Sequence, residues 1–164
     1  MKILVDAEEQ RSAVPSHLEA LGLSVEVSRL PVGDYQIADV AVERKTVRDL
    51  HQSLVSGTLW SQLFALRKGT ARSYLIVEGA DLDAGRVSSR GVRGALLHIA
   101  AAGVSVARST DPADTALWLH LIAEREKSAA EPSPRRRGRR RSVVSPVGVL
   151  ATVPGISPTT ADRR

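Results

Sequence analysis

The chain has 164 residues, of which 43% are hydrophobic and 25% charged, so we expect one packed domain with an appendage rather than a disordered polypeptide. It contains no cysteine, which excludes disulfides, thiolate metal sites and cysteine nucleophiles. No apolar run approaches the ~18 residues of a membrane span, so we expect a soluble intracellular protein with no membrane partner.

The net charge of +5 comes from the C-terminal tail, residues 132–164. Residues 132–164 hold eight arginines and one aspartate, a charge of +7, so the preceding residues sum to −2. We therefore expect the tail, rather than the folded part, to attract polyanions.

Strands and helices alternate along the first half of the chain. Apolar runs and alternation predict strands at 2–5, 24–30, 35–37 and 40–44, with the last two forming a hairpin that turns at Ala38-Asp39. Helical spacing predicts one helix at 14–22 and a longer helical stretch from Thr46 that is interrupted at Gly57.

The alternation continues in the second half. Strands are predicted at 74–77 and 104–107, and helices at 92–102 and 111–127. Asp111 is a suitable N-cap for the last helix, and Pro112 suits its first position. This order predicts an α/β domain ending near residue 127.

The composition changes beyond that point. Residues 128–142 contain the run PSPRRRGRRR and are expected to form a flexible basic linker. Six arginines there are candidates for sequence-independent phosphate binding: Arg135, Arg136, Arg137, Arg139, Arg140 and Arg141. Apolar residues return in 143–164, which is expected to be a separate segment.

Acidic and basic side chains gather around the predicted hairpin. Glu43 and Lys45 are two apart on a strand and share a face, and Asp34 falls nearly opposite Glu43. Two adjacent carboxylates repel each other unless one takes up a proton or a cation binds both. We therefore predict that Asp34 and Glu43 are ligands of Mg²⁺ or Mn²⁺, with Asp6 as a further candidate.

This set suits phosphodiester hydrolysis, which requires charge neutralisation at the phosphate and a positioned water. Lys45 is the candidate to orient that water. Glu9, like Asp6, could act through water or a second ion, and Arg44 with Asp49 is expected to form a supporting pair. The alternative is an amphipathic strand edge with mixed charges, which VAVERKT alone would also fit.

The stretch LPVGDYQIADVAVERKTVRDL resembles the nuclease signature of the XPF family of structure-specific endonucleases. Its parts are Gly33-Asp34, then Glu43-Arg44-Lys45, then Asp49. Upstream, ILVDAEEQRS is similar to the family's first strand, with Asp6 and Glu9 as its acids and Arg11-Ser12 as its basic-hydroxyl pair. Downstream, YLIVEG matches a later strand, so the resemblance covers roughly residues 2–127.

The resemblance implies a restriction-endonuclease-like PD-(D/E)XK core, a central mixed sheet flanked by helices. It also implies cleavage of DNA at flaps, forks or junctions in repair or recombination, with Mg²⁺ or Mn²⁺ as cofactor. The implied catalytic residues are Asp6, Glu9, Asp34, Glu43, Arg44, Lys45 and Asp49, and Arg11 and Arg44 are implied DNA contacts.

The implied partners are branched DNA, a second nuclease chain in a homodimer or heterodimer, and a sliding clamp or other repair factor. The location would be the cytoplasm near the nucleoid, or the nucleus in a eukaryote. The alternative is a catalytically silent subunit that binds DNA or docks an active partner, although such relatives typically lose the Glu-Arg-Lys motif.

Two positions depart from the family pattern. Glu8 and Thr58 stand where family members commonly carry arginine, which predicts weaker phosphate binding or altered substrate choice. Residues 149–164 resemble the start of a helix-hairpin-helix, with Gly155 as a DNA-binding candidate in its hairpin. The sequence ends at Arg164, so we expect only part of that motif in these residues.

Overall fold

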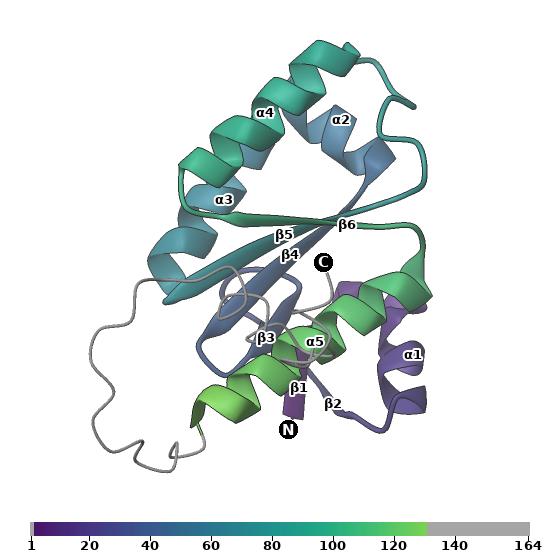
Figure 1. Ribbon diagram of the computed structural model, residues 1–164, viewed down its shortest axis with the longest axis vertical. Coiled ribbons are helices and arrows are strands. Elements are labelled where there is room, and N and C mark those ends of the chain that lie inside the picture. Colours follow the sequence, from purple (N-terminus) through teal and green to yellow (C-terminus); the bar gives the residue numbers. More distant parts are fainter. Residues whose placement is uncertain (1, 131–164) are drawn as a thin grey trace, which may run out of the picture. The chain divides into compact units, whose positions relative to one another are not determined.

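A six-stranded mixed sheet with helices on both faces makes up the part of the chain that the computed structural model describes, residues 2–130 (Figure 1). The strands are β1 (Lys2–Asp6), β2 (Ser24–Ser28), β3 (Tyr35–Ile37), β4 (Val40–Thr46), β5 (Arg72–Glu78) and β6 (Ser105–Ser109). The helices are the short 3₁₀ turn η1 (Glu9–Arg11), α1 (Val14–Ala20), α2 (Val47–Ser56), α3 (Thr58–Gly69), α4 (Ser89–Ala101) and α5 (Pro112–Ala130).

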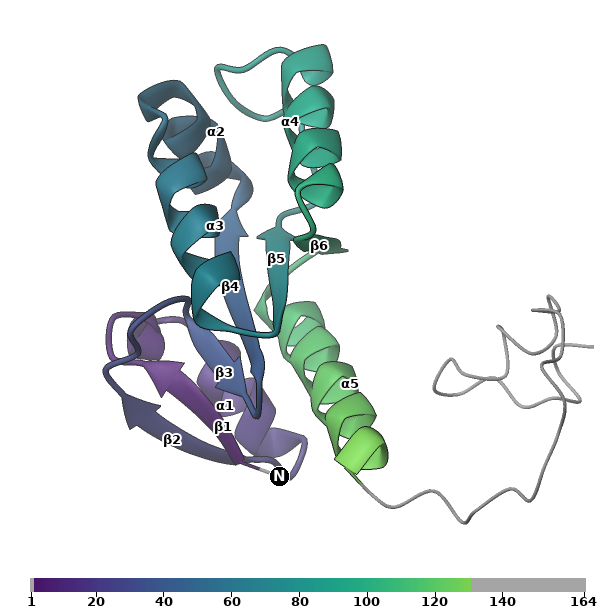
Figure 2. The same ribbon diagram turned by 90° about the vertical axis from the view of Figure 1, so that its left-hand side faces the viewer.

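The strand order is β2-β1-β3-β4-β5-β6. β3 runs antiparallel to both of its neighbours, and the other pairs are parallel. Five strands therefore end at the same edge of the sheet, and β3 begins there. Polar residues therefore lie along this edge, where Asp6 ends β1, Asp34 precedes β3 and Glu78 ends β5. Figure 2 shows β4 and β5 running side by side in the same direction.

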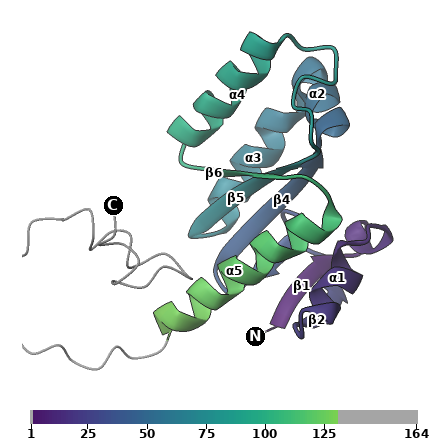
Figure 3. The ribbon, with the colours of Figure 1, turned by 45° about the vertical axis from the view of Figure 1, so that its right-hand side comes forward.

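Alternation along the strands divides the apolar residues between two cores. Ile76 faces a core with residues of α1 and α5, whereas Leu75 and Val77 face one with residues of α2, α3 and α4. Figures 1 and 3 show these two sets of helices on opposite sides of the sheet. The predicted central mixed sheet flanked by helices is confirmed.

Local signals fix most helix boundaries. The Thr46 hydroxyl accepts the Asp49 amide at 3.1 Å at the start of α2, and Gly57, at a φ of +78°, separates α2 from α3 as predicted. The Asp111 carboxylate accepts the Asp114 amide at 3.0 Å, and Pro112 opens α5. The helix predicted from residue 92 was too short, because α4 begins at Ser89, where Ser88 caps it through the Gly91 amide.

The last helix extends into the segment that was expected to be a linker. α5 continues to Ala130, so the first three residues of the predicted 128–142 linker are helical. The chain divides into two units, residues 1–123 and 124–164, and the sheet belongs to the first. The predicted domain boundary at residue 127 stays a prediction, and the basic run and residues 143–164 lie outside the described residues. Within residues 2–130, no helix has the length and apolar character needed to cross a bilayer.

Candidate active site

Asp34 and Glu43 lie side by side in the β3–β4 hairpin, as the hairpin pattern predicted. Tyr35 is paired with Val42, so the residue before β3 falls beside Glu43. The Asp34 amide donates to the Val42 carbonyl oxygen at 2.9 Å, and the Arg44 amide donates to Asp34 Oδ2 at 2.7 Å. The backbone of β4 therefore fixes the Asp34 carboxylate in place.

Gly33 makes this approach possible. Its φ is +74°, a region that L side chains rarely adopt. An added Cβ would lie 2.8 Å from Leu66 Cδ1 and 3.0 Å from the Val42 carbonyl oxygen. The Gly-Asp pair of the sequence motif thus has a steric basis, because only glycine fits before the carboxylate.

The site carries more buried negative charge than positive charge. Glu43 is 6% exposed and Lys45 is 9% exposed, and Lys45 Nζ donates to Glu43 Oε1 at 2.9 Å. Burial, followed by the charge of Glu43, raises the pKa of Asp34 to about 7. One lysine thus faces two carboxylates, and a further cation or a proton is needed to neutralise their charge.

The donor set fits a hydrated divalent ion. Mg²⁺ is commonly held by one or two carboxylates, with water and substrate phosphate completing its shell. Among residues 2–130, no three His, Cys, Asp or Glu side chains are placed to hold an ion together. Asp34 and Glu43 therefore match an open two-carboxylate site rather than an all-protein cage.

Asp6, the further candidate ligand, already has hydrogen bonds at both carboxylate oxygens. Oδ1 accepts the Glu8 amide at 2.9 Å, and Oδ2 accepts the Leu30 amide at 2.8 Å. These hydrogen bonds lower the pKa of Asp6. Asp6 thus shapes the loops beside the site and adds negative charge there, and its role as a ligand stays a prediction.

Two adjoining hollows open over these side chains. The first has a volume of about 530 Å³ and is lined in part by Asp34 and Glu43. The second has a volume of about 340 Å³ and is lined in part by Lys45 and Asp49. Gln62 of α3 lines both hollows, which therefore adjoin, and we call the two together the catalytic cleft.

The two positions that depart from the family pattern both border this cleft. Glu8 lines the first hollow, and Thr58 lines the second. Each lacks the positive charge of the arginine that family members commonly carry there. We therefore expect DNA phosphates to bind more weakly where Glu8 and Thr58 line the cleft.

Arg44 lies on the other face of β4 from Glu43 and Lys45. Its guanidinium donates from Nε to Glu78 Oε2 at 2.8 Å and from Nη1 to Glu9 Oε1 at 2.8 Å, and Nη2 bonds the second Glu78 oxygen. Burial opposes its charge, but the bonds to Glu78 and the charge of Glu9 raise the pKa of Arg44. The guanidinium does not line the catalytic cleft.

The expected pair between Arg44 and Asp49 is not formed. Asp49 instead accepts the Thr46 hydroxyl at 2.6 Å and so completes the cap of α2. Glu9, which was expected to act through water or a second ion, accepts the Tyr35 hydroxyl at 2.7 Å in addition to Arg44. Catalytic roles for these three residues stay predictions.

Sequence reasoning missed Glu78, which anchors the network behind β4. The Thr115 hydroxyl donates to Glu78 Oε2 at 2.7 Å, so this carboxylate joins β5 to α5 as well as to Arg44. The sequence did contain a signal for Glu78. YLIVE is an apolar strand that ends in an acidic residue, and ILVD near the start of the chain has the same pattern.

The structure describes one of the remaining predicted DNA contacts. Arg11 is exposed at the end of η1. The others lie outside the described residues: Arg135, Arg136, Arg137, Arg139, Arg140, Arg141 and Gly155.

Comparison with known proteins gives one family. Residues 5–122 match the model of the ERCC4 domain. The chain is 36% identical over 129 residues to the 3'-flap repair endonuclease Xpf of Saccharolobus solfataricus, covering 76% of this chain and 55% of the relative. It is 42% identical over 97 residues to the DNA repair endonuclease XPF of Cricetulus griseus, covering 58% of this chain and 10% of the relative.

Solved structures agree with this result. XPF from Aeropyrum pernix matches with a TM-score of 0.76 and 31% identity, covering 99% of this chain and 80% of that chain. A complex of the same protein with DNA matches with a TM-score of 0.70 and 30% identity, covering 99% and 78%. The chain spans only about a tenth to about half of the two curated relatives' own length.

Proposed function

The chain belongs to the ERCC4 domain family of XPF-type nucleases, and we propose that it is a divalent-metal-dependent DNA endonuclease. The observation that carries the proposal is the cluster of Asp34, Glu43 and Lys45 in an open cleft. Buried carboxylates with one lysine are poorly balanced for stability alone, and they match what phosphodiester hydrolysis requires.

Asp34 and Glu43 would hold the ion. A bound Mg²⁺ or Mn²⁺ offsets the charge that develops on the phosphate and lowers the pKa of a coordinated water. Lys45, fixed at 2.9 Å from Glu43, keeps an ammonium group beside the carboxylates, where it can orient the attacking water and stabilise the negative transition state. The Arg44 amide, bonded to Asp34, keeps that carboxylate turned toward β4.

The proposed substrate is DNA near a flap, fork or junction, in repair or recombination. Support comes from relatives: one is named a 3'-flap repair endonuclease, and the matching Aeropyrum pernix protein has been solved with DNA. The cleft itself is compatible with any phosphodiester, so the branch preference rests on those relatives.

We also propose that the chain works as a dimer through α4 and α5. Both helices expose large apolar side chains: Leu97 is 73% exposed, Leu117 is 46% exposed and Trp118 is 38% exposed. Exposed apolar groups of this size favour burial against a partner. Either a second copy of this chain or a related nuclease chain could bury these side chains.

The test is cleavage of labelled flap, fork, junction and plain duplex DNA with Mg²⁺, Mn²⁺ or EDTA. We expect metal-dependent cuts near the branch by the native protein and none by Asp34→Asn or Glu43→Gln, although both variants bind DNA. DNA binding without cleavage in either metal would instead identify a silent subunit. Equal cleavage by the native protein and the variants would refute the assignment of Asp34 and Glu43.

A further inference from the structure

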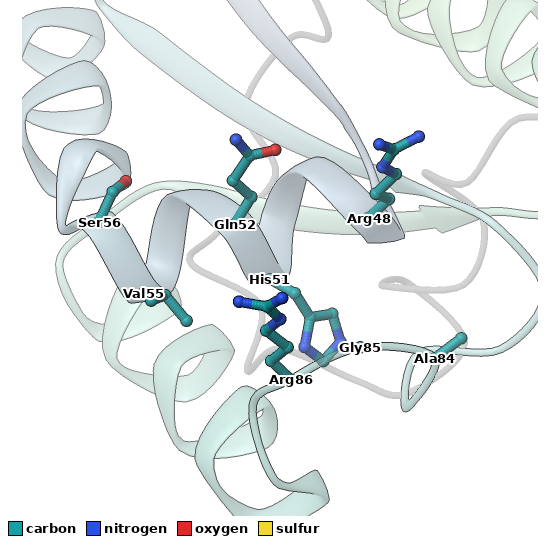
Figure 4. Close-up of a pocket in the computed structure, with 8 residues that line it drawn as sticks. All are labelled: Arg48, His51, Gln52, Val55, Ser56, Ala84, Gly85 and Arg86. Carbon is teal, nitrogen blue, oxygen red and sulfur yellow. The ribbon is translucent and has the colours of Figure 1, made fainter.

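A separate hollow lies beside the catalytic cleft, between α2 and the loop that joins β5 to α4. Its volume is about 450 Å³, within the range of small-molecule sites. It is lined by Arg48, His51, Gln52, Val55, Ser56, Ala84, Gly85 and Arg86 (Figure 4). None of these residues has a part in the proposed hydrolysis, and we call this hollow the α2 pocket.

The wall of the α2 pocket is pre-formed. His51 is 3% exposed and its ring is bonded at both nitrogens: Nδ1 accepts the Val87 amide at 3.0 Å, and Nε2 lies 2.9 Å from the Leu82 carbonyl oxygen. Because Nδ1 accepts, Nε2 is the nitrogen placed to donate to the Leu82 oxygen. Gly85 packs so closely that an added Cβ would lie 2.2 Å from His51 Cγ. The loop is thus held against α2 before any ligand arrives.

The pocket carries unpaired positive charge. Arg48 and Arg86 are exposed, and neither guanidinium has a hydrogen bond or an ion pair among residues 2–130. Arg93, by contrast, is bound by Asp83 of the same loop at 2.6 Å. Figure 4 shows Arg86 beside Val55 and His51, whereas the side chains of Arg48 and Gln52 point to the other side of α2. Two guanidinium groups are therefore available to an anion.

The α2 pocket adjoins the catalytic cleft across one row of α2 side chains. Gln52 and Ser56 line both the α2 pocket and the hollow that contains Lys45. Arg48, Gln52 and Ser56 recur every four residues on α2, a step of ~6 Å along the helix axis. A strand that lies over Lys45 can therefore reach the α2 pocket by crossing this row.

Resting on the proposed nuclease function, we propose that the α2 pocket binds one unpaired nucleotide of the DNA substrate. A guanidinium of Arg48 or Arg86 pairs with its phosphate, and the base packs on Val55, which is 65% exposed. A fully paired duplex presents phosphates and sugars while its bases stay stacked inside. The apolar part of the pocket thus suits a base that has left the stack, as bases do at a branch.

The test measures DNA binding in EDTA, where no cleavage occurs, so it is independent of catalysis. Fluorescence anisotropy would compare a fork with unpaired arms and a blunt duplex of the same length, over a series of salt concentrations. The variants are Arg48→Gln/Arg86→Gln and, without a charge change, Val55→Gln. The matched control is Lys68→Gln/Arg72→Gln, which removes two charges near the end of α3 and the start of β5, away from the pocket.

We expect the double arginine variant to bind the fork about tenfold more weakly, with a salt slope reduced by about 0.7 for each lost phosphate contact, and to bind the duplex like the control. Val55→Gln should weaken fork binding without changing the salt slope. Equal losses on fork and duplex, or no loss on the fork, would overturn the nucleotide pocket. Failure of the nuclease proposal would appear separately, as absent cleavage in metal with this binding pattern intact.

Discussion

Arg44 and Glu78 form a buried two-point ion pair directly behind the catalytic cleft. Their side chains are 11% and 8% exposed, and they join β4 to β5 on the face opposite Glu43 and Lys45. β4 therefore has buried ion pairs on one face, and on its other face Glu43 and Lys45 line the catalytic cleft. The Arg44 amide also donates to Asp34. The ion pairs of Arg44 therefore help to position the strand that supports the proposed site.

Glu78→Gln should reduce the free energy of unfolding by about 3 kcal/mol, because removing one partner of a buried pair leaves the Arg44 charge only partly compensated. Urea unfolding of the native protein and the variant measures this difference. Asp83→Asn is the matched control, since Asp83 pairs with Arg93 at the surface, and a much smaller change is expected there. Similar losses in the two variants would contradict a special role for the Arg44–Glu78 pair.

The advantage of native Glu78 over Gln should depend on pH. Burial opposes its charge, but hydrogen bonds from Arg44 and Thr115 bring the pKa of Glu78 below its ordinary value of 4.5. A lowered pKa contributes stability that is present above the unfolded-state value and is lost as the pH falls through the folded-state value. The difference between native protein and Glu78→Gln should thus be full at neutral pH and shrink below about pH 4.5. A difference that is constant down to pH 3 would contradict this.

The sequence predicted the hairpin and its carboxylates because both depend on local register. Once Ala38-Asp39 is taken as the turn, the period of two residues places Asp34 beside Glu43 and Lys45 on the same face. The network behind β4 could not be derived in this way. Arg44 and Glu78 are 34 residues apart, and their contact depends on how β4 and β5 align as parallel strands, which no local pattern specifies.

The partner of Asp49 was mispredicted for a related reason. Arg44 and Asp49 are near in sequence, but α2 begins between them at Val47, and Thr46 caps it through Asp49. The T-x-x-D spacing was available as a capping signal and competed with the interpretation of Asp49 as a partner for arginine. The α2 pocket escaped prediction because three of its eight lining residues come from the loop before α4, far from α2 in the sequence.

Trp118→Glu should convert the proposed dimer into a monomer, because a charge in an apolar contact surface costs more free energy than the contact supplies. Sedimentation equilibrium would measure the change from two chains to one. Phe64→Glu serves as the control, since Phe64 is 63% exposed but lies on α3, outside the proposed contact. A native protein that sediments as a single chain would exclude this dimer.

Asp34→Asn should remove stabilisation by divalent ions as well as cleavage. An ion that binds only the folded protein raises the free energy of unfolding by ~2.7 kcal/mol at a concentration 100 times its Kd. Thermal unfolding of the native protein should therefore shift upward with added Mg²⁺ or Mn²⁺, and that of Asp34→Asn should not. Asp111→Asn, at the cap of α5, should retain the shift. An equal shift in Asp34→Asn would place the ion elsewhere.

Gly85→Ala should loosen the loop that forms the α2 pocket, because its Cβ would overlap the His51 ring at 2.2 Å and the ring is held at both nitrogens. We expect a loss of about 1–3 kcal/mol, as for other overpacked sites. Gly94→Ala is the matched control: a Cβ there would meet no atom within 4 Å outside the backbone of α4 itself, so alanine should stabilise by about 0.5–1 kcal/mol. Hydrogen exchange at the Val87 amide, which donates to His51, reports the loop directly. Faster exchange in Gly85→Ala alone is the expected result, and unchanged exchange would mean that His51 does not hold the loop closed.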